Sequence, residues 1–282
     1  MAEVTAELLK QLRERTGVGM GKCKEALTEA KGDIELAIAN LRKAGIASAV
    51  KKESRETNEG VIAIAENNQY LSLVEINAET DFVVKNEKFQ QFAHMIAEEV
   101  CRHAPASVEA LLKLSCSKDP KLTLDEVRAI TIQSLGENIQ VKRLKLIAKK
   151  PNASLAVYSH SGGKLVTLVE IEGAGSYQDL AKDIAMHVAA ESPEYLNTDQ
   201  IPHDVLEREK DIARAQVKDK PAAIIDKIVE GKLKAFYAQA CLIYQPFIKD
   251  TSVSVGDLVQ NTGKAKGENL KLSYFLRWKV GE

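Results

Sequence analysis

The chain has 282 residues, which is long enough to bury a sizeable core and to form more than one domain. Its hydrophobic content of 45% and charged content of 28% are ordinary for a globular protein. With a net charge of −1, the chain as a whole is not drawn to nucleic acid or to an anionic membrane. No run of apolar residues approaches the length of a membrane span. Four cysteines without framework spacing are typical of reduced thiols, so we expect a cytoplasmic protein.

Residues 1–50 predict a small domain of three short helices. The first helix carries leucines on one stripe with charged residues between them, which is not the pattern of a signal peptide. Gly17 and Gly32 are suited to end the first two helices, and Asp33 is suited to cap the third. The charged segment 51–59 that follows is expected to be a solvated linker.

An internal repeat organises the rest of the chain. Three pairs of segments share their apolar pattern, and in chain order they are 71–76 with 166–171, 89–100 with 177–188, and 136–141 with 267–272. The last pair begins with Gly-Glu-Asn in both copies. We therefore predict two copies of one α+β unit, 60–150 and 151–282, each with a hairpin, a helix, a further helix and a closing strand. Pro105 and Pro193 are expected to end the matched helices.

The spacing between matched segments differs in two places. The first copy has extra residues within 77–88, where the second has only a short glycine-rich connection. The second copy has a long helical insertion, which predicts a protruding antiparallel hairpin over about 204–247 with its turn at 218–221. Features that both copies share serve the common fold most economically. Features of one copy alone are the better candidates for function.

Motifs for catalysis or metal binding are weak. The run TGVGMGKC at 16–23 follows a helix and lacks the first glycine and final Ser or Thr of a phosphate loop, so we interpret it as a turn. Cys101, His103 and Cys116 could supply three zinc ligands, but a buried thiol at a helix end is the favoured interpretation. No catalytic Ser-His-Asp or Cys-His set is identifiable. We therefore expect no catalytic residues, cofactor or resident metal.

Two histidines lie on the repeated helix at positions that do not match. His94 aligns with Lys182, and His187 aligns with Glu99. Each histidine is expected to be partly exposed, and His187 is a candidate for contact with a partner.

The extra residues of the first copy contain apolar side chains in a connection. Val83 and Val84 could fold down to complete the core. Phe82 is less easily explained in this way, because a protein gains the free energy of burying a ring equally by inserting it into a partner. Thr80 and Asp81 add polar groups beside it, which suits a wedge with polar guides.

Several segments together resemble the bacterial translation elongation factor Ts family, and the resemblance runs over essentially the whole chain. They are LRERTGVGMGKCKEALTEAKGDIELAI (12–38), NAETDFVVK (77–85), GENI (136–139) and IAMHVAA (184–190). The resemblance implies an N-terminal domain like the ubiquitin-associated (UBA) fold and a duplicated α+β core. It also implies a helical, coiled-coil hairpin inserted in the second half of that core.

The family resemblance implies a function as well. Members are guanine-nucleotide exchange factors for elongation factor Tu, which bind Tu·GDP, promote GDP release and leave when GTP rebinds. By motif, Asp81 and Phe82 are implied to enter the Tu nucleotide-binding domain, with Phe82 as a wedge near the Mg²⁺ site. Thr80 and Val83 complete this motif, which is implied to bind Tu and displace its Mg²⁺. The expected partner is therefore Tu, without direct contact to nucleic acid or membrane.

Further contacts and departures follow from the same resemblance. Arg13 and Met20 are implied to touch the Tu GTPase domain, and His187 another Tu domain. Ala78 stands where many members have Cys, and little consequence is expected. Some members continue beyond FLRWKVGE into a further helical module, so we expect contacts to depend more on the core and the N-terminal domain.

Two other classes of function remain open from the sequence. One is a UBA-type adaptor that binds peptides or a ribosomal surface without affecting nucleotide exchange. The other is a metal- or thiol-dependent enzyme that would use Cys101.

Overall fold

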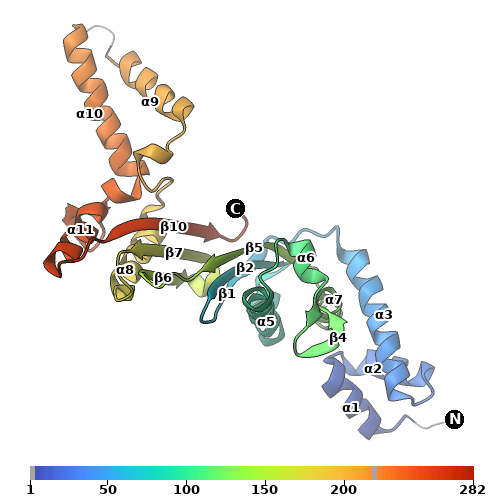
Figure 1. The fold of residues 1–282 in the computed structure, drawn as a ribbon. Coiled ribbons are helices and arrows are strands. Elements are labelled where there is room, and N and C mark those ends of the chain that lie inside the picture. The colour runs from blue at the N-terminus through green and yellow to red at the C-terminus, as the bar shows by residue number, and fades with distance from the viewer. Residues whose placement is uncertain (1–3, 218–220) are drawn as a thin grey trace. The chain divides into compact units, whose positions relative to one another are not determined.

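The computed structural model describes residues 4–217 and 221–282, and the chain divides into two compact units (Figure 1). One unit comprises the described residues up to Ala148 together with Lys279–Glu282, and the other comprises Lys149–Trp278. Each unit combines helices with a three-stranded sheet, as the predicted α+β class requires.

Three helices open the first unit, as the sequence predicts, and they are α1 (Ala6–Thr16), α2 (Met20–Glu29) and α3 (Ile34–Lys52). Gly17 ends α1 with a φ of 66°, and the Asp33 carboxylate caps α3 by accepting from the backbone N–H groups of Glu35 and Leu36. The helices enclose a hydrophobic cluster of their own, centred on Leu12 and Leu27. The glycine-rich segment between α1 and α2 is a turn, as expected.

Helix α3 extends further than the sequence predicts. The sequence predicts a solvated linker for Lys51 and Lys52, but they form the last turn of the helix. Basic side chains are favourable there because they complement the partial negative charge at a helix C-terminus. The connection to the first strand is therefore limited to residues 53–58.

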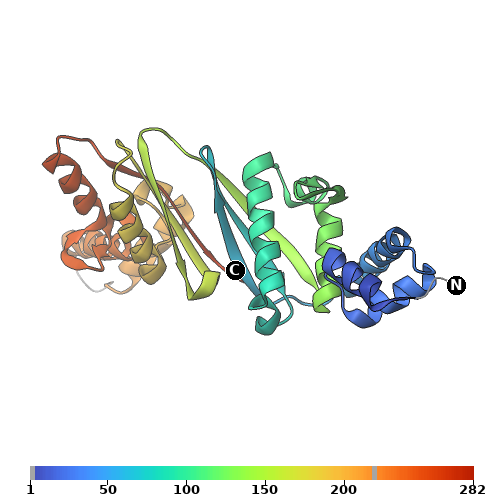
Figure 2. The ribbon, with the colours of Figure 1, turned by 90° about the horizontal axis from the view of Figure 1, so that it is seen from below.

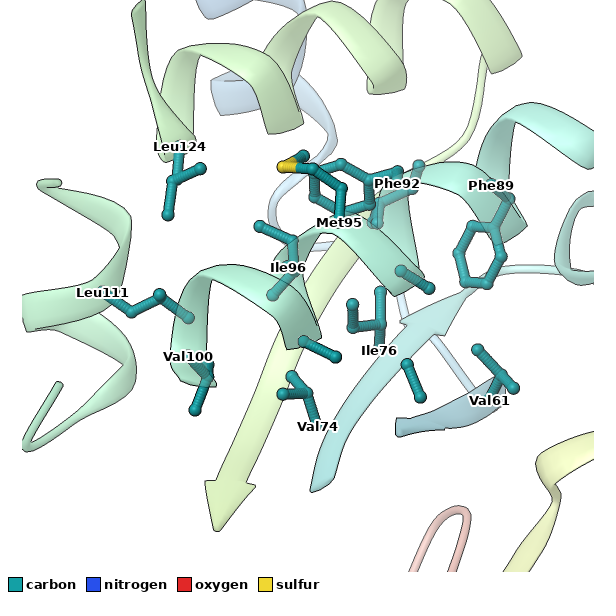
Figure 3. Close-up of a cluster of buried hydrophobic side chains, with 14 of the residues drawn as sticks. Val61, Val74, Ile76, Phe89, Phe92, Met95, Ile96, Val100, Leu111 and Leu124 are labelled. Carbon is teal, nitrogen blue, oxygen red and sulfur yellow. The ribbon is translucent and has the colours of Figure 1, made fainter. Parts of the chain in front are cut away.

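The first sheet has the order β1-β2-β5, with both pairs antiparallel. Its elements, in chain order, are β1 (Glu59–Glu66), β2 (Tyr70–Ala78), α4 (Asp81–Val84), α5 (Glu87–His103), α6 (Val108–Leu112), β3 (Ser115–Cys116), β4 (Asp119–Thr123), α7 (Leu124–Leu135) and β5 (Ile139–Ala148). Helix α5 packs on one face of the sheet (Figures 1 and 2). Figure 3 shows the core between them, where Val74 and Ile76 of the sheet meet Phe92 and Ile96 of α5.

The second unit repeats this order of elements around a sheet of order β10-β7-β6. Its elements, in chain order, are β6 (Ala153–His160), the short turn η1 (Ser161–Gly163), β7 (Leu165–Glu172), α8 (Gln178–Glu191), η2 (Thr198–Gln200), α9 (His203–Ala215), α10 (Ala222–Ala240), η3 (Leu242–Tyr244), β8 (Pro246–Phe247), β9 (Asp250–Ser254), α11 (Val255–Ala265) and β10 (Lys271–Lys279). Helix α8 packs on β6 and β7.

The repeat extends to single backbone angles. Helices α5 and α8 both end at a non-glycine residue in the left-handed region, Ala104 with φ 46° and Ser192 with φ 49°, and a proline follows each. Thr123 and Ser254 cap the matched helices α7 and α11. The small hairpins β3-β4 and β8-β9 also match, although the sequence did not predict them, since their strands are very short.

The helical insertion of the second copy forms α9 and α10, which contact each other. Most of its expected turn, residues 218–220, lies outside the described residues. The hairpin was expected to reach residue 247 but ends at Ala240. The reason is that Cys241 turns extended and forms a parallel bridge with Tyr195, and the Leu242 N–H donates to the Tyr195 carbonyl at 2.8 Å.

Among the residues described, no helix combines the length and apolar character needed to cross a membrane.

Candidate partner-binding loop

The extra residues of the first copy form a short loop, 79–86, that contains the one-turn helix α4 between β2 and α5. Thr80 caps this helix, and its hydroxyl oxygen accepts from the Val83 N–H at 3.4 Å. Asn86 then caps α5 by accepting from the Lys88 N–H at 2.9 Å. Two caps spaced in this way explain why the chain makes one turn, stops and starts a new helix.

Helix α4 divides its apolar side chains between the core and the solvent. Val84 is only 6% exposed and belongs to the core under the first sheet, and Val83 is partly buried against the same core. Phe82 is 81% exposed. The interpretation that the valines complete the core is confirmed, whereas the ring of Phe82 contributes little to it. An exposed aromatic ring on a short, capped helix is available to a partner.

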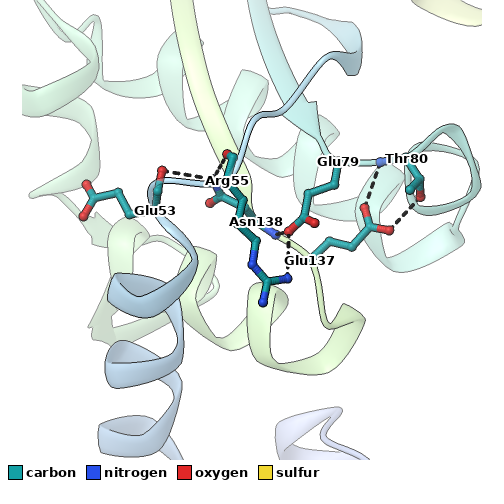
Figure 4. Close-up of polar contacts among 6 residues, drawn as sticks. All are labelled: Glu53, Arg55, Glu79, Thr80, Glu137 and Asn138. Atoms are coloured by element: carbon teal, nitrogen blue, oxygen red, sulfur yellow. Dashed lines mark hydrogen bonds and ion pairs between the residues drawn. The ribbon is translucent and has the colours of Figure 1, made fainter.

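Glu137 holds the beginning of this loop from a distant part of the chain. Its carboxylate accepts from the Thr80 N–H at 3.0 Å and from the Thr80 hydroxyl at 2.6 Å (Figure 4). Hydrogen bonds to a charged acceptor are stronger than those between neutral groups. The pair of bonds fixes the residue that caps α4, and thereby fixes where Phe82 stands.

A second set of contacts anchors the residue before Thr80. The Glu79 carboxylate accepts from the Asn138 N–H at 2.6 Å and pairs with Arg55 at 3.4 Å. The Asn138 amide in turn donates to the carbonyls of Glu53 and Arg55 (Figure 4). The loop therefore rests on two neighbouring residues of one Gly-Glu-Asn segment and on the connection that follows α3.

Asp81 lies beside Phe82 and pairs with Lys85 at 2.8 Å, one helical turn later. Both side chains are well exposed, and ion pairs of this kind contribute about 0–1 kcal/mol. A cation on a partner could therefore replace Lys85 at little cost. The tip of the loop thus presents an apolar ring next to an accessible carboxylate.

In the second copy, the connection from the second strand of the hairpin to the long helix contains no helical turn. Residues 173–177 lead directly from β7 to α8, and Gly173 has a φ of 118° with no room for a side chain against the Asn269 carbonyl. Tyr177, the residue before α8, donates its hydroxyl to Glu268. This hydrogen bond raises the pKa of Tyr177 to about 12. Glu268 is the counterpart of Glu137, so the glutamate of the repeated Gly-Glu-Asn holds this connection in both copies.

The N-terminal residues singled out from the sequence lie on the surface of the first unit. Arg13 is exposed on α1, and Met20 is 45% exposed at the start of α2. The turn before Met20 is tied to the first core half, because the Lys88 ammonium donates to the Gly17 carbonyl at 2.6 Å and to the Ser134 hydroxyl at 3.0 Å.

The prediction that His187 is partly exposed is wrong. Its side chain is fully buried and contacts Gln245 at 2.9 Å through Nε2, while Nδ1 accepts from the Ile248 N–H at 3.3 Å. Burial lowers the pKa of His187, which favours the neutral ring that these contacts need. His94, by contrast, is exposed beside Glu98, as expected.

The repeat explains why His187 is buried. Its counterpart in the first copy, Glu99, is also buried and accepts from the Ser117 N–H at 2.9 Å. Ser117 and Ile248 occupy matching positions at the tips of the small hairpins β3-β4 and β8-β9. Different residue types thus perform the same task, which is to satisfy a backbone N–H at the hairpin turn.

The residues considered for zinc do not form a cluster. Cys101 is buried and donates its thiol to the Ala65 carbonyl at 3.3 Å, so the interpretation as a buried thiol is confirmed. His103 instead contacts Glu99 at 3.2 Å. In the described part of the chain, no group of three or more His, Cys, Asp or Glu side chains is placed to hold a metal ion.

The anchoring residues of the loop were missed at the sequence level. In the sequence, Glu137 stands out only as part of a repeated Gly-Glu-Asn, which indicates a role in the common fold. The repetition was a usable signal, because a charged residue kept at matching positions of two copies indicates a specific bond. Its partner could not be identified from spacing, since Thr80 lies 57 residues away.

Comparisons with known proteins agree on one family. A family model described as "Elongation factor TS" matches residues 79–282. The chain is 57% identical to the elongation factor Ts of Protochlamydia amoebophila (strain UWE25) over 282 residues, which covers both proteins completely. It is 46% identical to that of Chlamydia caviae and 44% identical to that of Chlamydia muridarum, over 281 residues and again the full length of each.

Proposed function

The chain belongs to the elongation factor Ts family, and from this membership we propose that it is the guanine-nucleotide exchange factor for elongation factor Tu in translation elongation. In this proposal the chain binds Tu·GDP, promotes release of GDP and dissociates when GTP rebinds. It acts in the cytoplasm by binding alone, without covalent chemistry of its own and without direct contact to nucleic acid or membrane.

The observation that carries the proposal is the exposed ring of Phe82 on an anchored loop. A ring that is 81% exposed in the free protein gains roughly 1.5–3 kcal/mol when it is buried in a partner. Thr80 anchors the loop through its hydrogen bond to Glu137, and Val83 packs against the core. Asp81 presents a carboxylate beside the ring. In the complex, Phe82 would insert as a wedge near the Mg²⁺ site of Tu.

The wedge lowers GDP affinity through the metal. Mg²⁺ requires near-ideal octahedral coordination and bridges the protein to the nucleotide phosphates. A ring that shifts a supporting element of Tu displaces one ligand of the metal and so weakens the nucleotide. Coupling between two sites is reciprocal, so GDP lowers the affinity for the factor by the same ratio. The factor is therefore recycled without any catalytic residue.

The remaining family features are also proposals. We take the described helices within residues 1–50 as UBA-like and assign Arg13 and Met20 as contacts to Tu, since both are exposed. We take α9 and α10 as a coiled-coil hairpin of the second core half. His187 would contribute to Tu binding only indirectly, by fixing the small hairpin β8-β9 through Ile248.

The experiment that tests the function is release of fluorescent GDP from purified Tu, followed by stopped flow with excess unlabelled GDP. We expect the chain to accelerate release in a concentration-dependent, saturable manner. Tu alone provides the baseline. A UBA-type adaptor would bind its target yet leave the release rate at this baseline, and that result would exclude the proposed function.

A further inference from the structure

Lys88 of α5 joins the N-terminal helices to the helix that follows the loop 79–86. Its ammonium group donates to the Gly17 carbonyl at 2.6 Å and to the Ser134 hydroxyl of α7 at 3.0 Å. The Ser134 hydroxyl in turn donates to the same carbonyl at 2.9 Å. Both lone pairs of this carbonyl are therefore in use, and side chains of α5 and α7 meet the end of α1 at one oxygen atom.

The electrostatics of the two helix ends explain why a lysine stands at position 88. Gly17 ends α1, and the last carbonyls of a helix carry partial negative charge that favours a cation. Bonds from an ammonium group are also stronger than bonds between neutral groups. In the first turn of α5, by contrast, a lysine faces the positive end of the helix dipole. Helix α5 alone therefore does not favour Lys88, whereas the end of α1 does.

The Gly17 carbonyl belongs to the turn that leads to Met20. Val18, the next residue, has a buried side chain, and its carbonyl accepts from the Cys23 thiol of α2 at 3.4 Å. Met20 begins α2 and is well exposed. Because the turn is attached to α2 in this way, a bond that holds Gly17 also holds the start of α2, where Met20 stands.

The other contacts between the N-terminal helices and the first core half leave their orientation less well fixed. They are mainly one crossing of α3 with α7, where the buried Gly45 approaches the Ala129 carbonyl. An open pocket of about 290 Å³ lies beside this crossing, and packed helices can shift against each other at such a contact. The ion pair between Arg42 and Asp119 is long, at 3.8 Å, and adds little. Lys88 supplies a second fixed point, from α5 to a different N-terminal helix.

Lys88 is also bonded to the loop that presents Phe82. Asn86, the last residue of this loop, caps α5 by accepting from the Lys88 backbone N–H at 2.9 Å. Lys88 thus contacts the loop through its backbone and the turn before Met20 through its side chain. Glu137 holds the other end of the loop. The two exposed residues assigned to Tu are therefore linked through one lysine.

We propose that Lys88 is a positioning residue, which holds the N-terminal helices so that Met20 and Phe82 meet Tu as one preformed surface. This inference rests on the proposed function. A partner that contacts both residues orders less of the chain on binding, because the two elements are already fixed in the free protein. Lys88 therefore contributes to the affinity for Tu·GDP, whereas Phe82 determines the release rate within the complex.

The test measures release of fluorescent GDP from Tu over a range of factor concentrations, which gives a half-maximal concentration and a saturated rate. Lys88→Met removes the ammonium group and keeps an unbranched side chain of similar length. We expect it to raise the half-maximal concentration about threefold to tenfold and to leave the saturated rate within about twofold of the wild type. Lys88→Arg keeps the charge and the donors, so it should restore the wild-type half-maximal concentration.

Two further variants exclude simpler explanations. Arg102→Met removes one positive charge from the other end of α5, where the side chain is exposed, and should change neither quantity. Met20→Ala should itself raise the half-maximal concentration, and Lys88→Met in that background should add less than about twofold. An undiminished effect of Lys88→Met in the Met20→Ala background would mean that Lys88 contacts Tu itself, and would overturn the inference.

A second measurement uses the free chain. All four cysteines are buried, so spin labels are attached at Glu25→Cys on α2 and Gln91→Cys on α5, two exposed positions. Pulsed electron paramagnetic resonance then gives the distribution of distances between the labels. We expect this distribution to be broader in Lys88→Met than in the wild type, and to be unchanged in Lys88→Arg and Arg102→Met.

The outcomes separate this inference from the proposed function. If the wild-type chain does not accelerate GDP release, the proposed function fails, and the inference fails with it. If the wild-type chain accelerates release and Lys88→Met leaves the half-maximal concentration unchanged, only the inference is overturned. An equally narrow distance distribution in Lys88→Met and in the wild type would also overturn it.

Discussion

The two core halves differ most where the second strand passes to the long helix. In the second half this passage is the tight connection 173–177, which ends at a tyrosine held by Glu268. In the first half the equivalent Glu137 holds Thr80, and a capped turn of helix with an exposed phenylalanine follows. The glutamate is common to both halves and therefore belongs to the fold. The exposed ring occurs in one half only, so the fold does not require it.

A chimera that carries the connection of the second half in place of the loop would remove this difference directly. Residues 79–86 are replaced by the sequence Gly-Ala-Gly-Ser-Tyr of 173–177. We expect GDP release from Tu at saturating chimera to slow by about 100-fold, since up to about 3 kcal/mol of ring burial in the partner is lost. The chimera also loses the buried Val84, so its melting temperature falls while its circular dichroism remains mixed α and β. A folded chimera that still accelerates release at the wild-type rate would refute the assignment.

Matched substitutions of the shared glutamate would sharpen the same difference. Glu137→Gln turns one of the two acceptors for Thr80 into a donor, so the loop loses one charged hydrogen bond. We expect GDP release at saturation to slow about threefold to tenfold, because the ring is less well positioned. Glu268→Gln makes the same change at Tyr177 and serves as the control.

The control variant should lose some stability and keep the wild-type release rate. Release assays and chemical unfolding of both variants give the two quantities side by side. Equal slowing by Glu137→Gln and Glu268→Gln would mean that the glutamate acts through general stability rather than through the loop.

The smallest effect on exchange is expected at a position that the two halves have in common, occupied by Glu99 in the first half and by His187 in the second. The effect of changing His187 is expected in stability instead. Burial holds the pKa of His187 below its usual value, so between the folded and unfolded pKa values the unfolded chain binds more protons. The contribution of His187 to stability is therefore complete above about pH 6.5 and is lost as the pH falls through the lowered pKa. The slope is at most about 1.4 kcal/mol per pH unit.

Urea unfolding between pH 7.5 and 5 measures this dependence. His187→Gln should lower stability at pH 7.5 by about 1–3 kcal/mol and should flatten the decline towards pH 5. His94→Gln, which changes an exposed histidine on the matched helix, should leave the decline as it is. An unchanged decline in His187→Gln would show that another group is responsible.

Much of the fold could be predicted because its signals are local or repeated. The capping residue Asp33, the apolar period of the helices and the two matched hairpins all leave patterns within a short stretch of sequence. The repeat placed the elements of the second half by analogy with the first. It also identified the segment around Phe82 as an addition, and the exposure of that ring agrees with this interpretation.

The features that the sequence did not reveal depend on contacts between distant residues. Thr80 and Glu137 meet only after the sheet has formed, and no local spacing announces their bond. The sequence does not reveal the burial of His187, because the residue at the matching position, Glu99, is of a different type and so gives no sign that the two perform the same task. The strands of the small hairpins, such as Ser115–Cys116, are too short to show a period. The positive charges of Lys51 and Lys52 are compatible with a solvated linker and also with the C-terminal turn of a helix, so their residue type alone does not decide between the two.

The most direct test of the account is GDP release from Tu with Phe82→Ala, at saturating factor, with Val84→Ala as the matched control. Phe82 is exposed, so its removal should leave the melting temperature of the free chain unchanged and slow release by about 10- to 100-fold. Val84 is buried, so its truncation should lower stability by about 1–3 kcal/mol and leave the saturated release rate near that of the wild type. An unchanged release rate for Phe82→Ala at saturation would contradict the role of the ring as a wedge.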